Sequence, residues 1–345
     1  MGKKRYYVAL LMLAVALGAL VLLFQPRVMP PPGGGEAPAP AGSPSLSGWP
    51  RTFTDSLGHT LTLQRPVQRV VTMSPNLSEI VCAVGAGNCL VGVDDFTTYP
   101  PEAAAKPKIG GIINPNLESI LAVRPEVVLV ARGVDAQVLR RLQEVGGMET
   151  LSYDPQTLEQ VLDSTREIGR LCGKDAEAEK LAQSLEARKR AVEQRVAAAG
   201  TTRPRVMLVV SWDGLFVAGP ESFGNDLLQI AGGENVVKKM KGVKMDPWPG
   251  ITRELVVLSD PQVIIFAGKH ALPVRGEEQG ILEWLRRDGA WRELSAVKHG
   301  QVLIVDENLV TLPSPRLFDG LEKVAEVVVG VTAPTPTGAA PVGPP

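Results

Sequence analysis

The 345-residue sequence has few of the residues from which catalytic and metal sites are built. It contains three histidines and three cysteines, with no Cys-x-x-Cys pair and no Cys/His cluster, so a metal site is not expected. No G-x-S-x-G, P-loop or H-E-x-x-H motif is present, and no catalytic residue is nominated. The formal net charge is −1, without a long basic run beyond the first residues, which argues against nucleic acid as a partner. We therefore predict a protein that is not an enzyme and has no cofactor of its own.

The beginning of the sequence reads as a targeting segment. Lys3, Lys4 and Arg5 precede an uncharged apolar run over residues 8–24, with no cysteine near its end for lipid attachment. We predict an uncleaved membrane anchor over residues 1–25, with a cleaved signal as the alternative. The positive charges keep that end in the cytoplasm, so the body is exported and tethered to the membrane on the periplasmic or cell-surface side.

Two Pro/Gly-rich segments, residues 26–50 and 331–345, flank the part of the chain that has core-forming patterns. Within that part, short β-branched runs alternate with helical patterns, which predicts an α/β fold with parallel sheets covered on both faces. We divide it into an N-terminal α/β lobe (51–156), a connecting helix (157–200) and a C-terminal α/β lobe (201–330). The helical stretch has no proline, and Gly173 allows either one long helix or two in series.

A short cassette occurs twice, at residues 116–131 and 252–267. Each copy has a capping residue, a glutamate two positions later, a short helix, a proline and a buried strand. The spacing from glutamate to proline is the same for Glu118 and Glu254. The repeat predicts two related lobes that each present one carboxylate at a matching surface position, with a binding cleft between the lobes.

Ligands of open α/β sheets bind beyond the carboxyl ends of the strands. The loops predicted there carry Phe96, Tyr99, Trp212, Phe216 and Trp248, although aromatic residues are only 5% of the chain. Such rings suit a large, flat, partly apolar ligand. For any single ring, packing within its own loop is the alternative.

The cysteines and one helix start show two further local patterns. Cys82 and Cys89 flank a Gly-Ala-Gly turn and form either a disulfide or two small buried residues, whereas Cys172 is expected to pack in a helix. Asn76 and Glu79 have the spacing of a helix capping box.

Five segments together resemble one known family: residues 69–79 (RVVTMSPNLSE), 91–101, 232–236 (GGENV), 247–254 (PWPGITRE) and 314–316 (SPR). The family is that of the helical-backbone (class III) substrate-binding proteins of ABC importers for cobalamin, ferric siderophores and haem, and the cobalamin branch is the most similar. The resemblance covers residues 52–329. It implies two Rossmann-like lobes joined by a long helix, and a monomer that hands a large metal chelate to a permease dimer with its ATPase subunits.

The resemblance also implies residue roles. Glu118 and Glu254 correspond to the glutamates that contact arginines on the two permease subunits. Trp248, Phe216 and Arg132 match ligand-lining positions, whereas Phe96 stands in place of a tyrosine, and Ile112, Ala131 and Leu309 stand in place of tryptophans. The expected ligand-binding set is Phe96, Tyr99, Ile112, Arg132, Trp212, Phe216, Trp248, Leu309 and Arg316.

Cobalamin or a related corrinoid is the first expectation for the ligand, and two alternatives stay open. A ferric siderophore would use Arg132, Lys269 and Arg316, and haem would need Tyr99 or His270 as an axial ligand. An enzyme resembling a tetrapyrrole-metal chelatase, with His270 and Asp246 in the cleft, is the alternative from a different class.

Overall fold

The computed structural model describes residues 48–131, 134, 136–200, 202–244, 246–273 and 280–332. The predicted anchor and the apolar run that defines it lie outside these residues, as does residue 333 onward. Within the described part of the chain, no helix combines the length and the apolar character that crossing a membrane requires.

The first sheet contains four parallel strands in the order β4-β3-β5-β6. The strands are β3 (Val70–Thr72), β4 (Leu90–Val93), β5 (Val127–Val130) and β6 (Glu149–Ser152). Successive side chains of β5 enter two different cores: Val127 and Leu129 pack with helix α2 (Pro75–Ala83), while Val128 and Val130 pack with α4 (Leu117–Ala122) and α5 (Ala136–Gly146). Helices therefore cover both faces, as the continuous apolar strands predict. A hairpin of β1 (Arg51–Thr54) and β2 (Thr60–Leu63) precedes this sheet, and α3 (Pro101–Ala104) follows β4.

The second sheet has the order β11-β10-β7-β8, and β9 also pairs with β7. Its strands are β7 (Arg205–Ser211), β8 (Phe216–Val217), β9 (Glu234–Asn235), β10 (Val263–Ala267) and β11 (Val302–Val305). Helices α8 (Phe223–Ile230) and α12 (Leu317–Thr332) contribute to the core on one face. Helices α9 (Arg253–Ser259), α10 (Ile281–Arg287) and α11 (Ser295–Lys298) contribute to the core on the other. Pairs β7·β10 and β10·β11 are parallel, like β3·β5 and β5·β6, so the main strands of the two lobes share one topology.

Corresponding side-chain hydrogen bonds cap the helix of the repeated cassette in both lobes. The side chain of Asn116 accepts a hydrogen bond from the Ser119 amide and caps α4, and Thr252 accepts one from the Leu255 amide and caps α9. Each helix ends before a residue with positive φ, Arg124 at 43° and Asp260 at 40°.

An arginine at the start of each lobe's first central strand completes the other end of the cassette helix. Arg69 donates to the carbonyls of Val123 and Arg124, and Arg205 donates to those of Ser259 and Asp260. These carbonyls have no partner within their helices, so the arginines satisfy groups that would otherwise require water. The lobes are thus related in their hydrogen bonds as well as in their pattern.

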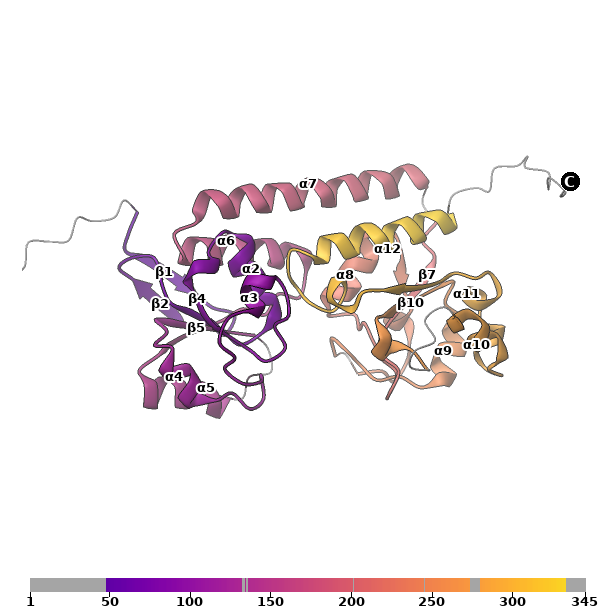
Figure 1. Ribbon diagram of the computed structural model, residues 1–345. Coiled ribbons are helices and arrows are strands. Elements are labelled where there is room, and N and C mark those ends of the chain that lie inside the picture. Colours follow the sequence, from indigo (N-terminus) through magenta and orange to yellow (C-terminus); the bar gives the residue numbers. More distant parts are fainter. Residues whose placement is uncertain are drawn as a thin grey trace, which may run out of the picture. The chain divides into compact units, whose positions relative to one another are not determined.

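Two helices, α6 (Leu158–Leu171) and α7 (Asp175–Ala199), occupy the predicted connecting stretch. The chain turns at Gly173, whose φ is +69°, and α7 packs back against α6. Beyond α6, α7 also contacts α8 and α12 of the C-terminal lobe (Figure 1). Helices α6 and α7 are tightly packed at Gly169, where an added Cβ would lie 2.2 Å from the Cβ of Ala178.

All three cysteines are free thiols in the structure. Cys89 and Cys172 are buried in the same core cluster of the N-terminal lobe, and Cys82 is partly buried beside it. The Cys89 thiol forms its hydrogen bond with Cys172, which lowers the pKa of Cys89 to about 7. In the structure Cys82 and Cys89 are therefore two separate packed residues, which is the second of the two alternatives.

The contact at Gly169 gives the first testable prediction. Gly169→Ala is expected to lower stability by roughly 1–3 kcal/mol, because α7 has to move away from the new methyl group. Urea denaturation measures the change. Gly330→Ala in α12 is the matched control, because nothing lies within 4 Å of a Cβ added there, and it should be neutral or slightly stabilising.

The double variant Gly169→Ala/Ala178→Gly tests the cause. Removing the opposing methyl group should recover part of the lost stability. A single variant as stable as the parent protein would show that the helices are not packed this closely.

Candidate functional site

A cavity of about 520 Å³ lies between the two lobes. Its walls come from segments that are far apart in the sequence and belong to both sheets. It lies within the size range of ligand pockets, and a larger ligand would project from it. The lining residues are Ser74, Asn76, Ala131, Tyr153, Asp154, Pro155, Gln156, Phe223, Asp246, Pro247, Trp248, Thr311, Leu312 and Pro313.

The wall from the N-terminal lobe follows the carboxyl ends of three parallel strands. Ser74 follows β3, Ala131 follows β5, and residues 153–156 follow β6. Gln156 donates from Nε2 to Asp154 Oδ1 over 2.7 Å, whereas its buried Oε1 has no hydrogen-bond partner. A buried acceptor without a partner is costly, and the residue that carries it belongs to the cavity lining.

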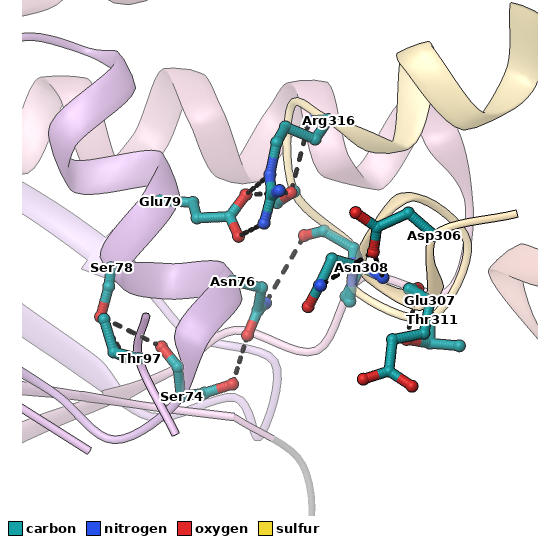
Figure 2. Close-up of polar contacts among 12 residues, drawn as sticks. Ser74, Asn76, Ser78, Glu79, Thr97, Asp306, Glu307, Asn308, Thr311 and Arg316 are labelled. Atoms are coloured by element: carbon teal, nitrogen blue, oxygen red, sulfur yellow. Dashed lines mark hydrogen bonds and ion pairs between the residues drawn. The ribbon is translucent and has the colours of Figure 1, made fainter. Parts of the chain in front are cut away.

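The wall from the C-terminal lobe is mainly apolar. The ring of Trp248 meets Phe223 edge to face, with centroids 5.1 Å apart, and the backbone amide of Trp248 donates to Asp246. Thr311 Oγ1 donates to the Glu307 carbonyl over 2.7 Å and fixes the loop that carries residues 311–313 into the cleft (Figure 2). The cleft therefore has an apolar wall with aromatic rings from the C-terminal lobe and a more polar wall from the N-terminal lobe.

A buried ion pair joins the lobes beside this cavity. Glu79 on α2 is almost fully buried, and Arg316, just before α12, donates to both of its carboxylate oxygens (Figure 2). Ser314 Oγ donates to the same carboxylate over 2.7 Å, and the Arg316 guanidinium lies 4.1 Å from the centroid of the Tyr99 ring. Glu79, Ser314 and Arg316, which we call the interlobe clamp, hold α2 against the segment that precedes α12.

The interlobe clamp corrects one expectation from the sequence. Asn76 and Glu79 do not form a capping box, because Ser74 is the N-cap residue and Pro75 takes the first helical position. The side chain of Asn76 instead accepts from Ser74 and donates to the Pro313 carbonyl over 3.5 Å. Glu79 is turned toward Arg316, a partner 237 residues away that local spacing cannot reveal.

Among the predicted ligand residues, Trp248 lines the cavity, whereas Phe96 and Phe216 are exposed and outside its lining. Phe96 is 66% exposed, and its loop is bonded to β3 through Asp94 N and the Thr72 carbonyl. Phe216 is 42% exposed and pairs with Gly250, in the same loop as Trp248. Ile112 is half-buried in the loop that meets Phe96, and Arg132 lies outside the described residues.

The other predicted ligand residues are not among those lining the cavity. Trp212 packs against Phe266, Trp284 and Trp291 in the C-terminal lobe, which is the packing alternative for a single ring. Leu309 is buried in the core beneath α12. Tyr99 and Arg316 line a second cavity of about 320 Å³, next to the interlobe clamp.

The sequence analysis does not predict several of the lining residues, although the sequence contains a signal for one group of them. Tyr153, Asp154 and Gln156 follow β6, so the carboxyl-end rule applied to that strand would nominate them. Phe223 had no such signal, since it begins a helix whose packing against Trp248 is visible only in three dimensions.

The described lining of the cleft contains two acidic residues, Asp154 and Asp246. Arg132, which directly follows the lining residue Ala131, lies outside the described residues. Burial raises the pKa of Tyr153, so the tyrosinate that iron coordination requires is disfavoured there. His270 is exposed and lies in a short 3-10 helix, Lys269–Ala271. Its backbone carbonyl accepts a hydrogen bond from the Trp212 amide. In the described part of the chain, no group of three His, Cys, Asp or Glu residues could hold a metal ion.

The two predicted docking glutamates occupy equivalent places. Glu118 and Glu254 are both exposed in the first turns of α4 and α9. A hydrogen bond from Thr252, together with a backbone hydrogen bond, holds the pKa of Glu254 below its usual range. Among the described residues neither carboxylate enters an ion pair, and the neighbouring Arg253 is paired with Asp288.

Comparison with known proteins adds three findings. The model of the periplasmic binding protein family matches residues 70–309. An uncharacterized ABC transporter substrate-binding lipoprotein of Bacillus subtilis is 28% identical over 285 residues, 81% of this chain and 86% of that protein. A vitamin B12-binding protein of Salmonella typhimurium is 34% identical over 203 residues, 58% of this chain and 73% of that protein.

A solved structure has the same fold. The apo form of a periplasmic haem-binding protein from Roseiflexus sp. RS-1 superposes with a TM-score of 0.66 at 22% identity, over 77% of this chain and 99% of that one.

The interlobe clamp generates a prediction. Arg316→Ala should destabilise the protein by about 3–5 kcal/mol, because it leaves the Glu79 carboxylate buried without its counter-charge. Urea denaturation measures this loss, and adding Glu79→Gln should recover part of it by removing the buried charge.

Arg65→Ala is the matched control. It removes an ion pair with Glu126 of 3.3 Å whose arginine is 56% exposed, and should cost at most about 1 kcal/mol. Equal losses for Arg316→Ala and Arg65→Ala would contradict the role of the clamp.

Proposed function

Because the chain belongs to the periplasmic binding protein family, we propose that it captures cobalamin or a related corrinoid outside the cytoplasm and delivers it to the permease of an ABC importer. Proteins of this family bind and release their ligands, and no chemical step is required of the cleft. A permease and its ATPase subunits are the partners that this role implies.

The observation that carries the choice of ligand is the apolar wall of the cleft. Trp248 and Phe223 meet edge to face on this wall, and Pro247, Leu312 and Pro313 line the cavity with them. A corrinoid is a large ring system whose side chains end in neutral amides, so its ring can lie against such a wall.

Two further features support a corrinoid. The unpartnered Oε1 of Gln156 is an acceptor that an amide N–H of the ligand would satisfy. The relative at 34% identity is named for vitamin B12, whereas the haem-binding structure is similar at 22% identity, a level that speaks for the fold alone.

A corrinoid would extend beyond the cavity. Phe96 and Phe216 are exposed, one on each lobe, and we propose that their rings cover the projecting part. The smaller side chains of Ile112 and Ala131, where the resemblance implies tryptophans, would leave this cover more open than in the cobalamin branch of the family. We also propose that the apolar run at residues 8–24 tethers the exported body to the membrane.

Calorimetric titration of the full chain with cyanocobalamin tests the ligand, with cobinamide, a ferric hydroxamate and haem titrated in the same buffer. One-to-one binding of cyanocobalamin, tighter than that of the iron chelates, is expected. Trp248→Ala should weaken it by about tenfold or more, through the loss of ring contact. Trp284→Ala, a ring in the packing cluster of Trp212, should leave the affinity unchanged.

Binding of the ferric hydroxamate or haem without binding of cyanocobalamin would overturn the proposed ligand while keeping the importer role. Unchanged cyanocobalamin affinity in Trp248→Ala would remove that ring from the site.

The docking role of the glutamates is tested by charge reversal. Glu118→Arg/Glu254→Arg should abolish ligand-stimulated ATP hydrolysis by the permease–ATPase complex and leave ligand affinity intact, because both carboxylates lie on exposed helix turns outside the cavity lining. Glu144→Arg/Glu326→Arg, one exposed glutamate in each lobe, is the control and should retain stimulation. Lost ligand affinity in the first variant would place the glutamates at the cleft instead.

A further inference from the structure

Exposed apolar side chains accompany the two docking glutamates at matched positions. Leu121 lies three residues after Glu118 on α4, and Val257 lies three residues after Glu254 on α9. Residues three apart share a helix face, so each carboxylate has an apolar neighbour beside it on the surface. Leu121 is 37% exposed and Val257 is 42% exposed.

The C-terminal lobe has a larger apolar surface than the N-terminal lobe. Leu258, four residues after Glu254, is 81% exposed, and the equivalent position on α4 is Ala122. Leu258 also forms one wall of a groove of about 570 Å³, which Val236, Met240 and Leu255 line as well. Two ion pairs at the groove, Arg205 with Asp260 and Lys239 with Glu234, neutralise much of the charge on its rim.

Single exposed apolar residues are normal on protein surfaces, but this set is not scattered. Three of the eight exposed large hydrophobic side chains in the described part of the chain lie on these two short helices. The same order of carboxylate and apolar residue in both lobes fits a partner that presents one surface twice, as a dimer of permease subunits does. A second copy of this chain fits poorly, because patches that both carry a glutamate repel each other.

We propose that each docking site is a composite patch in which the apolar residues hold the partner and the glutamate orients it. The N-terminal patch is Glu118, Leu121 and Ala122, and the C-terminal patch is Glu254, Val257 and Leu258. The matching surface of each permease subunit carries a basic side chain next to an apolar one. At the C-terminal patch an apolar permease side chain also enters the groove beside Leu258, which makes this the stronger half of the interface. This inference rests on the proposed delivery to a permease.

The physical reason is the weakness of an exposed ion pair. Water and salt compete for a carboxylate–guanidinium contact at a surface, so two such contacts alone contribute little to holding a partner. Apolar contacts around each pair exclude water from it and add their own burial. Charge then governs the rate and register of association, and the apolar residues govern the rate of dissociation.

Binding of the full chain to the permease–ATPase complex in lipid nanodiscs tests the proposal by interferometry. The triple variant Leu121→Ser/Val257→Ser/Leu258→Ser should bind about tenfold or more weakly, mainly through faster dissociation. Leu258→Ser should account for more of this loss than Leu121→Ser. Leu57→Ser is the matched control, because Leu57 is 69% exposed in the β1–β2 turn, outside both patches, and its variant should bind like the parent protein.

Three readouts separate the possible failures. Each variant is titrated with cyanocobalamin and melted, and both results should match the parent, since all the substituted side chains are exposed and outside the cavity lining. If Glu118→Arg/Glu254→Arg loses the permease while the triple serine variant keeps it, the composite patch is wrong and the docking role stands. If neither variant loses the permease, the docking role fails as well. An equal loss in Leu57→Ser, or self-association of the parent protein that the triple variant abolishes, also overturns the proposal.

Discussion

The arrangement of the binding site depends on one buried carboxylate. Glu79 is enclosed by the protein and needs a counter-charge, and the structure supplies it from the other lobe through Arg316 and Ser314. This requirement connects α2, whose first turn lines the cleft, to the segment that follows residues 311–313 on the opposite wall. Any opening of the cleft that separated these elements would expose or strand the charge. The clamp thus ties the two walls of the cleft together, and α7 adds contacts with α6 on one side and with α8 and α12 on the other.

The same constraint matters for docking. A partner with two equivalent surfaces can engage Glu118 and Glu254 together only if the distance between them is stable. Their local geometry is set by the cassette, in which a side-chain cap begins each helix and an arginine from the first central strand ends it. Because the lobes use corresponding caps and arginines, the two carboxylates occupy equivalent positions in the first turns of α4 and α9. Rigid coupling of the lobes and duplication within the chain together make a two-point interface possible.

Much of the fold could be predicted from the sequence because its signals are local. Apolar runs mark the strands at 127–130 and 302–305, and the structure has β5 and β11 with these same limits. The cassette was readable since its cap, glutamate, proline and strand are close in sequence. The turn at Gly173 was left open, because a glycine permits a break without requiring one. The interlobe clamp was missed, since no local pattern records that a glutamate on one helix will meet an arginine from the other lobe.

The site was less predictable than the fold, for a reason that its aromatic rings illustrate. Trp212 and Trp248 both stand in loops that the carboxyl-end rule nominates, and both are flanked by turn residues. Only Trp248 lines the cavity, because three other rings in the C-terminal lobe enclose Trp212. Which ring remains available to a ligand is decided by packing between distant elements. The acidic residues of the lining have the same origin: Asp154 follows β6 and Asp246 lies in the loop of Trp248, so they line one cavity only because the fold brings these distant segments together.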